Sequence, residues 1–231
     1  MKSIFLSFLL FTVIFSQAQQ TYRFYTPWYG AIGFHTISTS YSALGTEIKA
    51  PLTYADVHAV FFTQKGYMEF GIPVTGYILT GVIATGDLPD DNGEIPLLYA
   101  KGGWDIFKSK MIRIGLGASL NTVLINVDGI EGYGASLESY GTLSPMLYAK
   151  INIGPFLVVP VFEYNALSFA NTTGTTRPGF SFGSHFVIPV GKRLGINLNP
   201  VFEKGTFRNE VSGSMKSASV AFNVGLVVRP R

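Results

Sequence analysis

The chain has 231 residues, of which 47% are hydrophobic, 14% aromatic and only 13% charged, with 26 glycines and a formal net charge of +3. Soluble domains carry about 25% charged residues, so this composition disfavours an ordinary soluble domain and excludes the high-charge signature of disorder. The sequence has no cysteine, which excludes disulfides, thiolate metal sites and a cysteine nucleophile, and it has no basic run of the kind that binds nucleic acid.

The first eighteen residues have the layout of a secretory signal peptide. Lys2 gives a positive start, residues 4–15 form an apolar run, and Ser16-Gln17-Ala18 provides the small residues of a cleavage site. The apolar run is too short for a membrane-spanning helix, which needs about 20 residues, and this disfavours the alternative of a retained anchor. We therefore expect residues 1–18 to be removed and residues 19–231 to form one domain.

The rest of the sequence alternates with the two-residue period of β-strands. In the segment 113–126, RIGLGASLNTVLIN, one face is mainly aliphatic and the other carries Arg113 with small or polar residues. The segments 193–203 and 217–229 repeat this pattern. Alternate side chains of a strand point to opposite faces, so each segment predicts one apolar and one polar face. The segments are also as long as strands that cross a bilayer, which need about 9–11 residues, whereas soluble strands average about five or six.

Ten such strands are predicted along the chain, at residues 28–38, 52–63, 67–83, 95–107, 111–125, 140–153, 156–169, 179–190, 193–206 and 215–229. Tight turns and longer loops alternate between them. The turns are 64–66, 108–110, 154–155 and 191–192, and the loops are 39–51, 84–94, 126–139, 170–178 and 207–214. This layout predicts an all-β fold: a single antiparallel, up-and-down transmembrane β-barrel with short periplasmic turns and longer extracellular loops. The strand count is about ten, with 8 or 12 as alternatives.

The membrane interpretation depends on which face of each strand is outside. The uncharged run 70–86 contains four glycines and Pro73, which disfavours a spanning helix. In lipid only helices and closed barrels satisfy the backbone, so a barrel with an apolar exterior is the remaining choice. Its lumen would then be lined by the ionisable residues of the polar faces, namely Glu69, Lys101, Asp105, Arg113, Lys150, Glu163, His185, Arg193 and Glu203. A soluble lipocalin-like barrel would have the reverse arrangement.

Aromatic residues near the strand ends predict the girdles that membrane barrels place at the two interfaces. Those expected at the short-turn ends are Trp28, Trp104 and Phe156, and those at the long-loop ends are Phe169, Phe180 and Phe207.

The Ser16-Gln17-Ala18 signal, the alternation in RIGLGASLNTVLIN and the closing segment AFNVGLVVRPR resemble a small Gram-negative outer-membrane β-barrel protein. The resemblance covers residues 19–231 and is one of architecture, without a family-specific motif. It implies location in the cell outer membrane, contact with outer-membrane lipid, and delivery by periplasmic chaperones to the barrel-assembly machinery. A monomer that contains no cofactor and binds no nucleic acid is expected.

Two groups of residues are candidates for chemistry. His35, Asp56 and His58 lie on polar strand faces, where Asp56 could orient an imidazole as in a hydrolase triad, with Ser38 or Ser40 as nucleophile. A structural hydrogen-bond network in a polar lumen explains the same residues without catalysis, and we favour it.

The second group is the four loop carboxylates Asp87, Asp90, Asp91 and Glu94. Their spacing does not match a calcium loop, so no metal site is expected.

Ten strands enclose an interior near the filled end of the range for barrels, so a wide pore is not expected. Inward tyrosines such as Tyr99 and Tyr148 narrow it further. The sequence therefore favours a non-enzymatic outer-membrane barrel with a narrow, charge-paired lumen. Its role would be structural, mediated by its loops, or that of a narrow conduit for a small solute. The alternatives are an outer-membrane lipid-modifying or proteolytic enzyme using His35, Asp56 and His58, and a soluble periplasmic ligand-binding barrel.

Overall fold

The computed structural model describes residues 28–44, 46–74, 93–109, 111–127, 136–170, 176–209 and 213–229. The predicted signal peptide, residues 1–18, lies outside these ranges. The strands are β1 (Trp28–Ala43), β2 (Thr46–Phe62), β3 (Gly66–Val74), β4 (Gly93–Lys108), β5 (Ile112–Val127), β6 (Ser136–Ile153), β7 (Phe156–Asn165), β8 (Leu167–Ala170), β9 (Gly179–Pro189), β10 (Leu194–Asn209) and β11 (Gly213–Val228). None of the described residues belongs to a helix long and apolar enough to cross a membrane.

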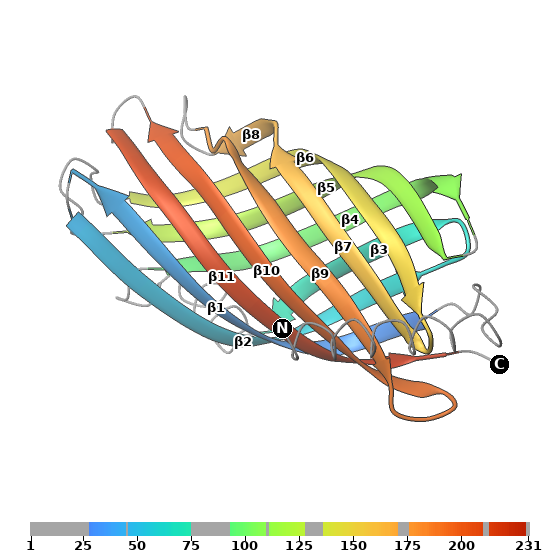
Figure 1. Cartoon of the computed structure of the whole chain (residues 1–231). Coiled ribbons are helices and arrows are strands. Elements are labelled where there is room, and N and C mark those ends of the chain that lie inside the picture. Colours follow the sequence, from blue (N-terminus) through green and yellow to red (C-terminus); the bar gives the residue numbers. More distant parts are fainter. Residues whose placement is uncertain are drawn as a thin grey trace, which may run out of the picture.

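The strands form one closed antiparallel barrel (Figure 1). The ring closes because β1 pairs with β11 and β5 pairs with β6. Strands β7 and β8 both pair with β6 and are separated only by Ala166, so they share one position in the wall. The eleven strands therefore occupy ten positions, and the predicted ten-stranded up-and-down barrel is confirmed. Closure gives every strand except the four-residue β8, which pairs only with β6, partners on both sides, as a hydrocarbon environment requires.

At the long-loop side, two predicted connections are wrong. Strands β1 and β2 are 16 and 17 residues long, so most of the predicted loop 39–51 is strand, up to Ala43 in β1 and from Thr46 in β2. In the same way β10 extends to Asn209 and β11 begins at Gly213, both within the predicted loop 207–214. The prediction ended each strand where the apolar alternation fades, but ladder hydrogen bonds need no apolar face and continue beyond it. The other three loops, 84–94, 126–139 and 170–178, fall partly outside the described residues.

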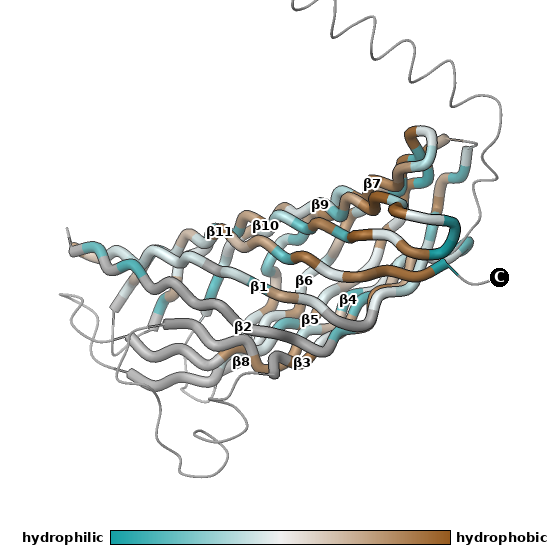
Figure 2. Tube along the Cα trace, turned by 90° about the horizontal axis from the view of Figure 1, so that it is seen from below, coloured by the Kyte–Doolittle hydropathy of each residue, from teal (hydrophilic) through white to brown (hydrophobic). Residues whose placement is uncertain are grey.

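The wall is apolar outside and polar inside. On β5, Leu116 is 52% exposed on the outer face, whereas Arg113 and Ser119 on the inner face are 3% and 1% exposed. Figure 2 shows hydrophobic and hydrophilic positions alternating along the strands. On β11, Val220 and Leu226 face outward and Asn223 is buried inside. A soluble ligand-binding barrel has the opposite arrangement, so that alternative does not hold.

The outer face supports a direct test. Phe182 lies on it and is paired with Phe162 and Phe202 on the adjacent strands, well inside the apolar band. We expect Phe182→Arg to lower the free energy of unfolding from lipid vesicles by about 2–4 kcal/mol, because an arginine there faces hydrocarbon. Urea titration followed by tryptophan fluorescence measures the change. Val190→Arg in the β9–β10 turn, where Val190 is 60% exposed, is the control, and equal losses in the two variants would contradict a lipid-facing exterior.

The aromatic residues predicted for the interfaces divide between the two faces. Trp104, Phe156, Phe169 and Phe180 are exposed outside, as girdle residues should be, but Trp28 and Phe207 are buried inside the barrel. Trp28 points inward because a β-bulge between Gly30 and Gly33 shifts the alternation of β1 by one residue. Its ring lies under the guanidinium of Arg229, at 4.3 Å.

Candidate functional site

The interior is built in levels along the barrel axis. On β6, the buried residues run from Tyr148 and Met146 near the short turns, through Ser144 and Thr142, to Tyr140 near the other end. β9 shows the same order, with Val187 buried near the short turn and Ser181 buried further along the strand. Since inward residues of neighbouring strands meet in layers, the sequence produces one filled level and one polar level.

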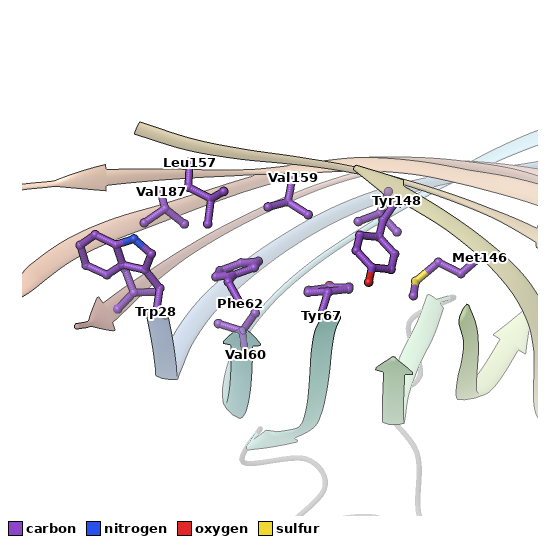
Figure 3. Packing of buried hydrophobic residues seen from close by; sticks show 11 residues of the cluster. Trp28, Val60, Phe62, Tyr67, Met146, Tyr148, Leu157, Val159 and Val187 are labelled. Carbon is purple, nitrogen blue, oxygen red and sulfur yellow. The ribbon is translucent and has the colours of Figure 1, made fainter. Parts of the chain in front are cut away.

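The filled level, which we call the interior plug, lies in the half of the barrel near the short turns (Figure 3). Figure 3 shows Leu157, Val159 and Val187 facing Phe62 and Tyr67 across the interior. Tyr67 stacks on Phe62 with ring centroids 5.7 Å apart, and Tyr148 lies 5.6 Å from Tyr67. Several members of the plug, among them Tyr67, Val159 and Val187, are fully buried. The complete set is Trp28, Val60, Phe62, Tyr67, Met146, Tyr148, Leu157, Val159, Val161, Val187 and Val227.

Beside the plug lies a group of charged residues, Asp105, Arg113 and Lys150, which we call the Asp105 network. It connects the β2–β3 turn to the wall by hydrogen bonds. Asp105 accepts from Lys150 at 2.7 Å, Arg113 at 3.3 Å and the Tyr148 hydroxyl at 2.9 Å. Lys150 also donates to the carbonyl of Thr63 at 2.8 Å, and Arg113 donates to the next carbonyl along the turn. The ionised side chains are almost completely buried. Three residues predicted to line the lumen therefore form one buried cluster.

A second cluster lies at mid-height. Lys101 pairs with Glu163 across the interior at 2.7 Å, and Ser119 donates to the same carboxylate. Glu69 accepts a hydrogen bond from Tyr67, and its carboxylate lies 3.4 Å from His185 Nε2. The other ring nitrogen of this histidine is 3.1 Å from the Asn197 amide. The structure thus brings four further predicted lumen residues together, with tyrosine, serine and asparagine as additional partners.

Above these clusters the polar level encloses the mid-lumen cavity, of about 140 Å³. Small inward residues such as Thr142, Ser181 and Ser219 leave this space open. Its lining includes Arg177 and Glu203, whose side chains form an ion pair at 2.9 Å. The guanidinium of Arg177 also lies 4.6 Å from the centre of the Phe207 ring.

The predicted catalytic residues are only partly assembled. His35 and His58 both face the interior, with ring centroids 6.1 Å apart and the rings perpendicular. The backbone of Asp56 pairs with that of Gly33, but the side chain of Asp56 is not among the described parts of the chain. Neither candidate nucleophile can join the histidines from this strand, because Ser38 and Ser40 occupy the face of β1 opposite to His35.

Two further predictions concern residues at the ends of the strands. Arg193 is exposed in the β9–β10 turn instead of lining the lumen, because β10 begins one residue later; its carbonyl accepts the Arg229 N–H at 2.8 Å. Asp87, Asp90 and Asp91 lie outside the described residues, and for Glu94 only the backbone, in β4, is described. Among the residues that are described, no group of three or more histidine, aspartate or glutamate side chains could hold a metal ion.

Sequence reasoning missed Arg177 and Asn223, which both line the cavity. Arg177 fell within the predicted loop 170–178, where no alternation marks a direction. Asn223 lies on the polar face of the predicted strand 215–229, and its shared parity with Ser217 and Ser219 indicates that it faces inward. Its side chain is not ionisable, so charge does not mark it as a lumen residue.

The closed wall, the apolar exterior and the polar interior define the class: this is an integral membrane β-barrel with the architecture of outer-membrane proteins, as the sequence predicted.

No family model and no curated protein matches the chain. Among solved structures it is similar to the outer membrane protease OmpT from Escherichia coli, with 8% identity, coverage of 89% of this chain and 95% of that one, and a TM-score of 0.37. It is also similar to the outer membrane protein OprG from Pseudomonas aeruginosa, with 8% identity, coverage of 87% and 97%, and a TM-score of 0.32. For the attachment invasion locus protein Ail of Yersinia pestis the values are 8% identity, coverage of 88% and 99%, and a TM-score of 0.30.

Proposed function

We propose that the protein is a non-enzymatic, structural barrel of the outer membrane whose lumen is closed to solute flow. The interior plug carries this proposal. Tyr67, Val159 and Val187 come from three different strands and are each fully buried, which supports a lumen without a path for water and ions at this level. This disfavours the narrow conduit among the roles that the sequence left open.

The buried charges fit a structural role. Lys101 is neutralised by Glu163, and Asp105 by Lys150 and Arg113. A buried ion held by an opposite charge and by hydrogen bonds is stable only in one geometry, because separating the partners leaves a charge in a low-dielectric interior. The lumen of the proposed scaffold is therefore narrow and charge-paired, and its charges fix the wall strands relative to one another.

The remaining parts of the proposal concern processing and partners. Residues 1–18 would be cleaved on export, and the mature chain would be delivered by periplasmic chaperones to the assembly machinery and inserted as a monomer surrounded by outer-membrane lipid. The predicted extracellular loops, such as 84–94 and 126–139, would make the loop-mediated contacts of such a scaffold. The alternative of a lipid-modifying or proteolytic enzyme gains the proximity of His35 and His58, but its candidate nucleophiles, Ser38 and Ser40, lie on the opposite face of β1.

Conductance in planar bilayers tests the closed lumen. The purified full chain, shown to be folded by its heat-modifiable migration on gels, is added to a bilayer in 1 M salt, a concentration at which electrostatic screening extends over only about 3 Å. We expect no steady current steps, because the plug excludes water. Reproducible steps from the folded protein would overturn the proposal and restore the conduit.

A further inference from the structure

We propose that the mid-lumen cavity is a binding site for a small uncharged molecule that carries hydroxyl or amide groups, and that Asn223 is its main anchor. This site goes beyond the structural role proposed above and does not depend on it, since a barrel closed at the plug can still hold a ligand in the level above.

The first observation is the state of the Asn223 side chain. It is 2% exposed and lines the cavity, yet neither Nδ2 nor Oδ1 has a hydrogen-bond partner among the described residues. A buried amide without partners is strongly disfavoured, because it has given up its hydrogen bonds to water. An asparagine offers two N–H donors and one carbonyl acceptor. A matching ligand therefore both donates and accepts hydrogen bonds, as hydroxyl and amide groups do.

Two other side chains that can donate and accept hydrogen bonds lie beside the Asn223 amide. Asn223 on β11 is directly opposite His35 on β1 and Asn199 on β10, and all three side chains line the cavity. Gly33 leaves room for this row: a Cβ there would lie 2.8 Å from Asn223 Oδ1 and 2.5 Å from a ring carbon of His58. Any larger residue at this position would push the amide or the imidazole out of place.

The charges of the cavity select against ions. Its lining contains two acidic residues, Glu69 and Glu203, and two basic ones, Lys101 and Arg177. Both bases already form ion pairs with carboxylates, at 2.7 and 2.9 Å. A charged ligand would have to compete with one of these partners, whereas an uncharged ligand leaves both pairs intact.

The size of the cavity limits the ligand further. At about 140 Å³ it is comparable to protein cavities that hold benzene, so it accepts a molecule of about six non-hydrogen atoms. Glycerol is of this size and carries three hydroxyl groups, and acetamide is a smaller molecule with the amide chemistry. A hexose is about twice as large and would not fit without rearrangement of the wall.

Nuclear magnetic resonance of the full chain in lipid nanodiscs, with isotopically labelled asparagine, tests the site. The probes are glycerol and acetamide, and propionate and isopropylammonium serve as charged molecules of similar size. We expect saturable shifts of the Asn223 side-chain amide with the two uncharged probes and none with the charged ones. Asn223→Leu, which keeps the branched shape of the side chain but removes the donors and the acceptor, is expected to weaken glycerol binding at least tenfold. Asn152→Ala, at the far end of β6 and outside the cavity lining, is expected to leave the affinity unchanged.

Three results would overturn the proposal. The first is a linear, non-saturating response to both uncharged probes, which would show that the cavity holds water only. The second is equally tight binding of propionate or isopropylammonium. The third is undiminished glycerol binding by folded Asn223→Leu. If that variant does not fold, Ser219→Leu provides the same test by filling the cavity from the same strand: loss of glycerol binding supports the site, and retention excludes it.

Discussion

Replacing Asp105 by asparagine is expected to lower the free energy of unfolding by about 3–5 kcal/mol, the loss typical of breaking a buried ion pair from one side. The substitution preserves the size of the side chain and removes its charge. Lys150, at 2.7 Å, and Arg113, at 3.3 Å, would then remain almost fully buried without their shared anion. The Tyr148 hydroxyl, which donates to the same carboxylate, would keep an acceptor in the amide oxygen, so the loss would reflect the two cations.

The measurement is urea unfolding of the protein in lipid vesicles, with two comparisons. Glu47→Gln makes the same chemical change at an exposed position near the end of β2 and is expected to alter the free energy of unfolding by no more than about 0.5 kcal/mol. In the double variant Asp105→Asn/Lys150→Met one unpaired cation is absent, so its loss should be smaller than the sum of the two single losses. Equal stability of Asp105→Asn and Glu47→Gln would contradict the structural importance of the Asp105 network.

Much of the architecture could be predicted from the sequence because a barrel wall is governed by local rules. The period of two in residues 113–126 and 217–229 fixes which side chains share a face, and the shortage of charge fixes which face meets lipid. What could not be predicted depends on the backbone ladder itself. The bulge between Gly30 and Gly33 reverses the direction of Trp28, and the continuation of β1 to Ala43 needs no apolar pattern.

The site shows the same division between local and non-local information. Parity assigns Lys101 and Glu163 to the inward faces of their strands, but it does not indicate that the two side chains meet. Their strands, β4 and β7, are not adjacent, and the contact spans the interior between residues 62 positions apart. Which inward residues meet depends on the tilt and stagger of the closed sheet, which a single sequence does not specify. Arg177 was missed for a related reason, because it enters the lumen from a segment without strand alternation.

Removing the aromatic rings of Phe62, Tyr67 and Tyr148 together is expected to convert a silent barrel into a conducting one. The centroid of the Tyr67 ring lies 5.7 Å from that of Phe62 and 5.6 Å from that of Tyr148, so the three rings form a row in the plug. The triple alanine variant replaces them with a space that water can enter. Each truncation of a large buried side chain costs about 3–5 kcal/mol in a well-packed core, so folding has to be confirmed by heat-modifiable migration before conductance is measured in planar bilayers.

The matched control is Phe162→Ala/Phe182→Ala/Phe202→Ala, which removes three rings from the lipid-facing side of the wall and should leave the bilayer silent. A folded triple variant that stays silent would show that the rings are not what closes the lumen.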